Sequence, residues 1–204
     1  MRTSIWLVRH GQTELNRARR YQGAIDSPLT SYGLRQAAAL ARRLRRIPFS
    51  VALVSPALRA QVTAETILAE RDVPIIEEPG WREASHGRWE GLTYREVRER
   101  FPAEASARFA DALHGKPEGG ESLAEVAERV VEGWRALLGQ FPGGRVLVVT
   151  HATPVQLVLC LLSDMAVTQH WRWRIDLGSL TAIDVYGGGA IVRMVNETPR
   201  LAEL

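Results

Sequence analysis

The sequence is poor in cysteine and in long apolar runs. Cys160 is the single cysteine among 204 residues, so neither a disulfide framework nor a thiolate metal site can form within one chain. The longest apolar run, residues 157–162, is far too short to cross a bilayer. The N-terminus lacks the apolar region and cleavage site of a signal peptide. These features predict a cytoplasmic protein with no membrane partner.

Lysine is almost absent as well. Lys116 is the one lysine among 26 cationic residues, and the others are arginines. Because 23 acidic residues are mixed with them, the formal net charge is only +3, and we attribute the excess of arginine to composition. The one dense cluster is Arg42, Arg43, Arg45 and Arg46. It falls in the last turns of a predicted helix, where cations complement the helix dipole and face water. We therefore expect no nucleic-acid partner, although a phosphate or nucleic-acid patch is the alternative interpretation of this cluster.

One domain over residues 1–204 is expected, since a chain of this length buries a substantial core. Short apolar runs rich in β-branched residues predict strands that are covered on both faces. They lie at residues 4–8, 51–54, 146–150, 180–185 and 190–195, with 74–76 as a weaker candidate. A glycine-rich turn joins the last two runs and predicts a hairpin. One antiparallel edge strand is therefore expected in a mainly parallel sheet.

Stretches with helical periodicity separate these strands. Residues 31–46 repeat apolar side chains on one face, and Thr30 or Ser31 is expected to cap this helix. Ser55 is followed by Pro56, which predicts a second helix with proline at its first position. Strands that alternate with helices favour a parallel sheet covered by helices.

Two further helices are predicted in the second half of the chain. Ser122 and Glu125 form a capping box, and Gly139 is expected to end the helix that follows. The last helix is expected to begin at Thr153 and Pro154. With helices on both faces of the sheet, the fold class is α/β and the architecture is a three-layer α/β/α sandwich.

Residues 85–120 contain no strand-like run. They are interpreted as an excursion over one edge of the sheet, here called the roof segment. Excursions of this kind often cover a binding site.

Polar side chains collect at the ends of three predicted strands. Arg9, His10 and Gly11 end the first strand, Arg59 lies in the first turn of the helix after the second, and His151 ends the third. In open α/β sheets, ligands bind beyond the carboxyl ends of the strands, where the following helices present their N-termini. Two histidines and two arginines on one rim therefore favour a site.

Phosphate is the ligand that such a rim suits. Arginine side chains pair with phosphate oxygens, and helix N-termini add positive potential. Cationic neighbours disfavour protonated imidazole, so a histidine held there keeps a lone pair for nucleophilic attack. A proton donor for the departing oxygen is also needed, and "WREASHGRWEG" offers Glu83 and Glu90. The residues alone do not decide between these two acids.

The same residues resemble a known family, the histidine phosphatases of the phosphoglycerate mutase superfamily. Arg9-His10-Gly11 is similar to the Arg-His-Gly that ends the first strand in that family. The similarity continues in order along nearly the whole chain. It runs through Asn16, "YQGAIDSPLTSYGLRQA" at 21–37, "SPALRAQVTAETI" at 55–67, "REASHGRWEG" at 82–91, "GGES" at 119–122, "VVTHATPV" at 148–155 and "NETPRL" at 196–201.

The resemblance implies a fold, a reaction and a role for several residues. It implies the α/β/α sandwich and identifies His10 as the nucleophile that becomes phosphohistidine. Glu83 would protonate the leaving alcohol and then activate water, while Glu90 is interpreted as structural. No metal and no other cofactor are implied. Arg9, Arg59 and His151 would bind the phosphoryl oxygens, and Gly11, Asn16, Gln22, Gly23 and Ala152 would contribute to the substrate pocket.

Two positions depart from the family pattern. Ala152 stands where glycine is common, which adds a methyl group where backbone can approach the substrate. Ser85 and His86 stand where a more apolar pair is usual before Gly87, which predicts a different preference for the alcohol. Neither departure removes a catalytic group.

The expected function is hydrolysis of phosphomonoesters, with a small phosphorylated metabolite as substrate. A phosphoglycerate mutase is one alternative, but the family's mutases carry a longer basic insertion after the "WEG" region, and a shorter roof admits water. A phosphate-binding module without chemistry is the other alternative. It is disfavoured because both His10 and Glu83 are present. The identity of the substrate is left open, as is a homodimer.

Overall fold

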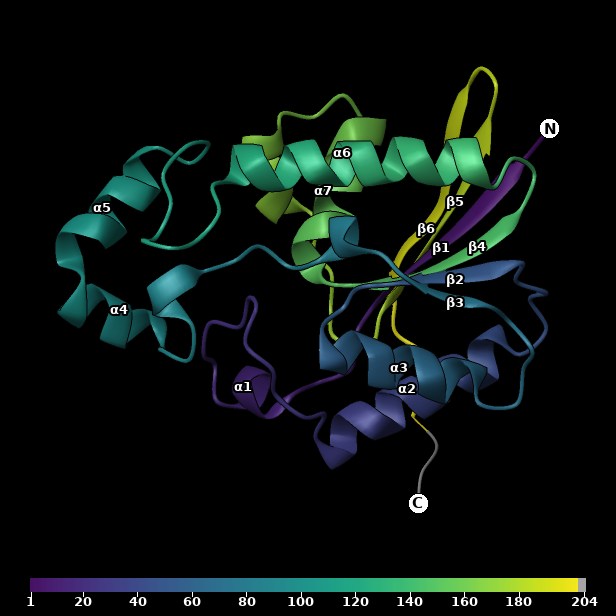
Figure 1. Cartoon of the computed structure of the whole chain (residues 1–204), viewed down its shortest axis with the longest axis horizontal. Coiled ribbons are helices and arrows are strands. Elements are labelled where there is room, and N and C mark those ends of the chain that lie inside the picture. Colours follow the sequence, from purple (N-terminus) through teal and green to yellow (C-terminus); the bar gives the residue numbers. More distant parts are fainter. Residues whose placement is uncertain (202–204) are drawn as a thin grey trace.

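Six strands form one mixed sheet in the computed structural model, which describes residues 1–201 (Figure 1). Their order across the sheet is β3-β2-β4-β1-β5-β6. The strands are β1 (Thr3–Arg9), β2 (Val51–Val54), β3 (Ile75–Glu77), β4 (Arg145–Thr150), β5 (Leu180–Tyr186) and β6 (Gly189–Glu197). All the predicted strands are present, including the weaker candidate at 74–76, which forms β3. The expectation that they are covered on both faces is wrong for the edge strands β3 and β6, whose side chains are largely exposed because each has a neighbour on one side only.

Helices cover both faces of the sheet, as Figure 1 shows. On one face lie α2 (Ser31–Leu44) and α3 (Leu58–Leu68), and on the other lie α6 (Leu123–Gln140) and α7 (Ala152–Leu162). Successive side chains of a strand point to opposite faces, so Ile5 and Leu7 of β1 pack with α6 and α7, while Trp6 and Val8 pack with α2 and α3. The predicted three-layer α/β/α sandwich is confirmed.

The strand that runs against the others is β5. It pairs antiparallel with β1 on one side and with β6 on the other, whereas β1, β2, β3 and β4 pair in parallel. The expectation of an antiparallel strand is correct, but its position needs refinement. The tight hairpin adds β6 outside β5, so the antiparallel strand lies one place in from the edge.

The roof segment contains helices and no strand. It includes the 3-10 turn η2 (Gly87–Trp89), α4 (Tyr94–Arg100) and α5 (Pro102–Ala110). These helices stand apart from the sheet in Figure 1 and have a small core of their own, built on Trp89, Val97 and Ala105. A second 3-10 turn, η1 (Pro79–Trp81), links β3 to this segment.

Helix ends differ from the sequence predictions in four places, the first being the end of α2 at Leu44, two residues before the predicted end at 46. Thr30 caps α2 as expected, but α3 begins at Leu58 with Ala57 as its N-cap, so Pro56 lies before the helix. Glycine at position 139 does not end α6, which continues to Gln140. The last helix begins at Ala152, one residue earlier than expected. The predicted capping box of α6 is confirmed.

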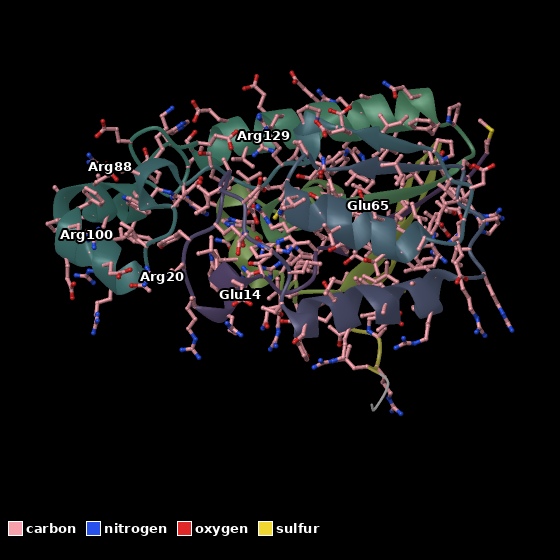
Figure 2. All side chains as sticks on the ribbon, turned by 60° about the horizontal axis from the view of Figure 1, so that its bottom comes forward. Glu14, Arg20, Glu65, Arg88, Arg100 and Arg129 are labelled. Carbon is pink, nitrogen blue, oxygen red and sulfur yellow. The ribbon has the colours of Figure 1, made fainter. Side chains whose placement is uncertain are left out.

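Charged side chains cover the outside of the molecule, and Figure 2 labels Glu65, Arg88 and Arg100 among those that are exposed. The four arginines near the end of α2 are exposed too, and one of them, Arg43, pairs with Glu197. Within residues 1–201, no helix is long and apolar enough to cross a membrane.

Candidate active site

The first strand places His10 at the rim of the sheet. β1 ends at Arg9, and the backbone N–H of His10 donates to the carbonyl of Thr150, 3.0 Å away. The imidazole is 3% exposed, and its Nδ1 lies 2.8 Å from the carbonyl oxygen of Gly11. A carbonyl oxygen can only accept, so Nδ1 carries the proton and the lone pair lies on Nε2.

Parallel pairing of β1 with β4 brings the second histidine beside the first. Arg9 is in register with Thr150, so the residue after each strand falls at the same point of the rim. The rings of His10 and His151 have centroids 5.0 Å apart and planes at 63°. His151 is fully buried, and its Nε2 lies 2.7 Å from the hydroxyl oxygen of Ser55, which follows β2.

Two arginines reach the same place from different elements. Arg59, in the first turn of α3, is 1% exposed and donates to the carbonyls of Gly23 at 2.7 Å and Ile25 at 3.3 Å. Arg9 donates to the carbonyl of Ile175 at 2.7 Å. Neither guanidinium forms an ion pair with any residue in 1–201. Both positive charges are therefore available to an anion.

Several buried nitrogen atoms around these side chains lack a hydrogen-bond partner within residues 1–201. They are Nε of Arg9, Nε of Arg59, Nδ1 of His151 and Nε2 of Gln22. Buried polar atoms are normally paired, so a group of unpaired ones in one cluster needs an explanation. A phosphoryl group, with several acceptor oxygens and negative charge, is a ligand that would satisfy them.

The environment keeps both imidazoles neutral. Burial lowers the pKa of His10 well below its usual value, and the charges of Arg59 and Arg9 lower it further. Burial also lowers the pKa of His151 well below its usual value, followed by the effects of His10 and of Arg59. A neutral His10 keeps the Nε2 lone pair at physiological pH, which a nucleophile requires.

Glu83 lies in an irregular segment between η1 and η2. Its side chain is half-buried, and Oε1 accepts a hydrogen bond from the backbone N–H of Ala84 at 2.9 Å. Burial lowers the pKa of Arg9 and of Arg59, and the charge of Glu83 opposes this in both. The carboxylate is thus within electrostatic reach of both arginines.

Glu90 ties two loops together. Its carboxylate accepts backbone hydrogen bonds from Ala24 and Ile25 at 2.9 Å and from His86 at 3.0 Å. These contacts join the loop that Arg59 binds to the start of the roof segment, and they occupy both carboxylate oxygens. This geometry supports an anchoring role for Glu90 and leaves Glu83 as the candidate acid.

Asn16 and Gln22 are held by Thr13. The side-chain oxygen of Asn16 accepts from the backbone N–H of Thr13 as part of the capping box of the short helix α1 (Glu14–Arg17). The hydroxyl of Thr13 donates to Oε1 of Gln22 at 2.7 Å. That bond orients the amide of Gln22, whose Nε2 is one of the unpaired buried atoms.

Gly11 and Gly23 lie where the backbone is tightly packed. A Cβ on Gly11 would lie 2.5 Å from the carbonyl oxygen of Gly33, and one on Gly23 would lie 2.2 Å from a carboxylate oxygen of Glu90. Both positions therefore require glycine for close approach. Ala152 begins α7, directly after His151, and packs against the core below that helix.

A cavity of about 470 Å³ opens beside the cluster. Its walls are Gly23, Ala24, Asp26, Pro56, Ala57, Arg82, Glu83, Ser85 and Glu121. Glu83 faces this space, while His10 is more deeply buried. The cavity is large enough to receive an organic group attached to a phosphate held by the arginines.

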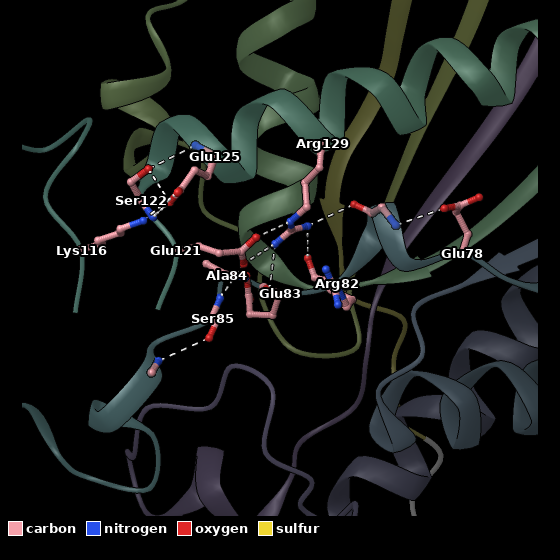
Figure 3. A network of polar contacts seen from close by, with 12 residues as sticks. Glu78, Arg82, Glu83, Ala84, Ser85, Lys116, Glu121, Ser122, Glu125 and Arg129 are labelled. Carbon is pink, nitrogen blue, oxygen red and sulfur yellow. Dashed lines mark hydrogen bonds and ion pairs between the residues drawn. The ribbon is translucent and has the colours of Figure 1, made fainter. Parts of the chain in front are cut away.

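Some residues that support the site were missed by the sequence analysis. Thr63 lies four residues after Arg59, accepts from the backbone N–H of Gly11 and donates to the carbonyl of Arg59. Helical spacing on α3 could have revealed it. Arg129 and Glu121 hold the segment of Glu83 (Figure 3), and no sequence spacing relates them to it.

No group of three or more His, Cys, Asp or Glu side chains in residues 1–201 is placed to hold a metal ion. The positive charge at the site comes from Arg9 and Arg59.

The chain is similar to known proteins along nearly its whole length. The profile of the histidine phosphatase superfamily (branch 1) matches residues 5–198. The adenosylcobalamin/alpha-ribazole phosphatase of Escherichia coli K12 is 33% identical, over 94% of this chain and 95% of that protein. Phosphoserine phosphatase 1 of Hydrogenobacter thermophilus is 32% identical, over 97% of this chain and 93% of that protein. A solved structure of a putative alpha-ribazole-5'-P phosphatase from Escherichia coli has a TM-score of 0.91 and 32% identity, covering 98% of this chain and 99% of that chain.

A longer relative matches as well. A bifunctional protein of Mycobacterium tuberculosis is 38% identical over 198 residues, which is 96% of this chain. The chain spans 54% of the length of that relative.

Proposed function

The chain belongs to the histidine phosphatase superfamily, branch 1, and on this basis we propose that it is a phosphomonoesterase that works through a phosphohistidine at His10. The observation that carries the proposal is the tautomer of His10. Its proton is on Nδ1, so the lone pair of Nε2 is free in a buried site beside the guanidinium groups of Arg9 and Arg59, whose hydrogen bonds within residues 1–201 go to neutral backbone carbonyls.

In the first step, Nε2 of His10 attacks phosphorus and the bond from phosphorus to the ester oxygen breaks. Arg9, Arg59 and His151 bind the phosphoryl oxygens and stabilise the charge that develops on them. Glu83, as the carboxylic acid, gives its proton to the departing alcohol oxygen. The alcohol leaves, and the phosphoryl group is bound to His10.

In the second step, the Glu83 carboxylate takes a proton from water. The resulting hydroxide attacks the phosphohistidine, the phosphorus–nitrogen bond breaks, and inorganic phosphate is released. Glu83 is again the acid and His10 again neutral. One ester and one water thus give one alcohol and one phosphate, and the chain's own guanidinium groups supply the positive charge.

A small phosphorylated metabolite is the proposed substrate. The cavity of about 470 Å³ beside Glu83 has room for a leaving group of that size. Relatives whose names refer to alpha-ribazole and phosphoserine phosphatases are similar along nearly the whole chain. These relatives support a phosphatase but do not select one alcohol.

The experiment is hydrolysis of p-nitrophenyl phosphate by the wild type and by His10→Ala, with and without a chelator. We expect activity that the chelator leaves unchanged and that His10→Ala abolishes. The matched control is His114→Ala, because His114 is exposed on the roof segment. Labelled phosphate should be trapped on the wild type, stable to alkali and labile to acid, and not on His10→Ala. An active His10→Ala protein would refute the phosphohistidine route.

A second assay, taken together with the hydrolysis test, separates the two alternative functions. With 3-phosphoglycerate and a trace of bisphosphoglycerate, a phosphatase releases inorganic phosphate, whereas a mutase forms 2-phosphoglycerate. A module without chemistry would bind phosphate and hydrolyse none of the esters.

A further inference from the structure

The segment that carries Glu83 has little structure of its own. Residues 82–86 form neither helix nor strand. Just before them, the carbonyl of Trp81 accepts a hydrogen bond from the hydroxyl of Thr150 at 2.6 Å. Just after them, Glu90 holds the backbone of His86. The direction of the Glu83 side chain therefore depends on what holds the peptide groups between these two anchors.

Arg129 holds them from α6, as Figure 3 shows. Its Nη1 donates to the carbonyls of Gly80 at 3.1 Å and Arg82 at 2.8 Å. Its Nη2 donates to the carbonyl of Glu83 itself at 3.0 Å. Two consecutive peptide groups, those of Arg82 and Glu83, are thus bound by one planar guanidinium group. This fixes the orientation of the backbone from which the Glu83 side chain departs.

Glu121 completes the arrangement. It accepts from Nε of Arg129 at 2.8 Å and from Nη2 at 2.9 Å, and the same carboxylate accepts from the backbone N–H of Ser85 at 2.9 Å. The backbone N–H of Glu121 also donates to the carbonyl of Ser85 at 2.9 Å. The segment is therefore attached on both sides of Glu83.

All five N–H groups of Arg129 are used in these bonds, and its side chain is 15% exposed. Arginine offers five donors in one plane, while lysine offers three that can rotate. If Arg129 served only to neutralise a charge, its ion pair with Glu121 would be sufficient. An ion pair does not require the three further hydrogen bonds that Arg129 donates to backbone carbonyl oxygens.

We propose that Arg129, held by Glu121, is a positioning residue that aims the carboxyl group of Glu83 at the departing oxygen of the substrate. Arg129 touches no reacting atom in this role and acts through the backbone of the acid. The inference rests on the proposed function, because it assumes that Glu83 is the proton donor.

Its consequence is specific to the leaving group. An ester whose alcohol is a weak acid needs the proton from Glu83, whereas an acidic phenol leaves without it. A misplaced Glu83 carboxyl group should therefore slow the hydrolysis of esters of weakly acidic alcohols and leave the hydrolysis of esters of acidic phenols nearly unchanged. A purely structural role of Arg129 would lower the activity toward both kinds together.

The test uses a series of substituted phenyl phosphates, from p-nitrophenyl phosphate to p-methoxyphenyl phosphate, which share a shape and differ in leaving-group acidity. For Arg129→Gln, we expect kcat/KM to fall by about 10²-fold with the least acidic phenol, the order of loss that misplacement of a catalytic group by ~1 Å causes. With p-nitrophenol as leaving group the fall should be about threefold or less, because general acid catalysis contributes little there. The dependence of kcat/KM on phenol acidity thus becomes steeper.

Four reference variants make the result interpretable. For Glu83→Gln, the dependence of kcat/KM on phenol acidity should be steep, because this variant lacks the acid. Arg135→Gln, at an exposed arginine of the same helix, should match the wild type. The dependence for Arg129→Lys should be intermediate in steepness between those of the wild type and Arg129→Gln. The dependence for Glu121→Gln should be steeper than that of the wild type. If Arg129→Gln does not fold, these last two variants provide the same test.

The inference would be overturned if the Arg129 and Glu121 variants lost kcat/KM equally with all phenols and kept the shallow dependence on phenol acidity of the wild type. Glu83 would then still be the acid. If Glu83→Gln instead showed the same shallow dependence of kcat/KM on phenol acidity as the wild type, the proposed function would be overturned. The two failures are therefore distinguishable.

Discussion

The hydroxyl oxygen of Ser55 lies 2.7 Å from Nε2 of His151. The same oxygen lies 3.4 Å from the backbone N–H of Ala57, which donates to it and leaves the hydroxyl proton free to point toward the imidazole. We infer that Ser55 donates to Nε2 and that the single proton of the neutral ring is on Nδ1. Nδ1 is the buried atom without a partner, so it is the donor that can bind a phosphoryl oxygen.

Ser55→Ala is therefore expected to lower activity without changing the nucleophile. Without the hydroxyl, the ring of His151 loses the bond that sets its tautomer, and kcat/KM should fall about tenfold, as for loss of a hydrogen bond of roughly 1.4 kcal/mol. Steady-state kinetics with p-nitrophenyl phosphate measures this. Ser106→Ala, at an exposed position of α5, is the matched control and should match the wild type. Full activity of Ser55→Ala would contradict the assignment.

The protonation of His10 can be followed directly by NMR of labelled histidine. Because burial and the charges of Arg59 and Arg9 lower its pKa, the ring should stay neutral as the pH falls through about 6.5, the ordinary value for histidine. Arg59→Met removes one of those charges, so the pKa of His10 should rise. Arg135 is not one of the charges that lower the pKa of His10, so Arg135→Met is expected to leave that pKa unchanged. A His10 ring that titrates near 6.5 in the wild type would contradict the proposed environment.

Stability should fall as the pH drops below the ordinary histidine pKa. Burial lowers the pKa of His10, His86, His151 and His170 in the folded protein. Below pH ~6.5 the unfolded chain binds protons that the folded chain does not, so each of these groups costs up to about 1.4 kcal/mol per pH unit. The contribution is fully present above that pH and is lost on acidification.

Urea unfolding between pH 7.5 and 5.5 measures this slope. His170→Gln, in the 3-10 turn η3 (Val167–Arg172), should make this slope shallower because one titrating group is removed. The carboxyl groups of Glu96 and Glu125, whose pKa is lowered to about 2 by hydrogen bonds, should add to acid unfolding only below this range. A stability independent of pH in that range would show that these histidines are accessible to protons.

Gly23→Ala is expected to damage both stability and activity. Its Cβ would lie 2.2 Å from Glu90 and 2.7 Å from the carbonyl oxygen of Ala84, and Gly23 supplies the carbonyl that orients Arg59. Overpacking of this kind costs about 1–3 kcal/mol. The matched control is Gly139→Ala in α6, where a Cβ meets nothing within 4 Å. That change should stabilise the helix by about 0.5–1 kcal/mol. Urea unfolding and phosphate release measure the two effects.

Local patterns were sufficient to predict the elements and the rim. The runs that form β1 and β4 are apolar in their interiors and bounded by polar residues, and His10 and His151 each directly follow one of them. Pro56 was misplaced because proline favours a helix start but does not specify at which residue the start occurs, and the chain turns once more before α3. The strand next to the edge was misjudged because a hairpin defines its two members and not which of them lies outside.

The support of the site could not be predicted from sequence in the same way. Arg129 is 46 residues from Glu83 along the chain, and it reaches the segment only because α6 packs beside η1. Ser55 enters the sequence analysis only as the residue before Pro56, and its bond to His151 depends on β2 and β4 being neighbours. Such contacts follow from the order of strands and helices in space, which periodicity does not encode.

The register of β1 with β4 constrains the number of residues in each strand as well as their types. Adding or deleting one residue in either strand would turn the imidazole that follows it toward the opposite helical layer, because side chains alternate between faces. A chain altered in this way could keep every functional side chain and still separate the two rings. Evolution of this site is thus constrained by the number of residues in β1 and β4. Insertions and deletions in these two central strands should be less tolerated than substitutions there.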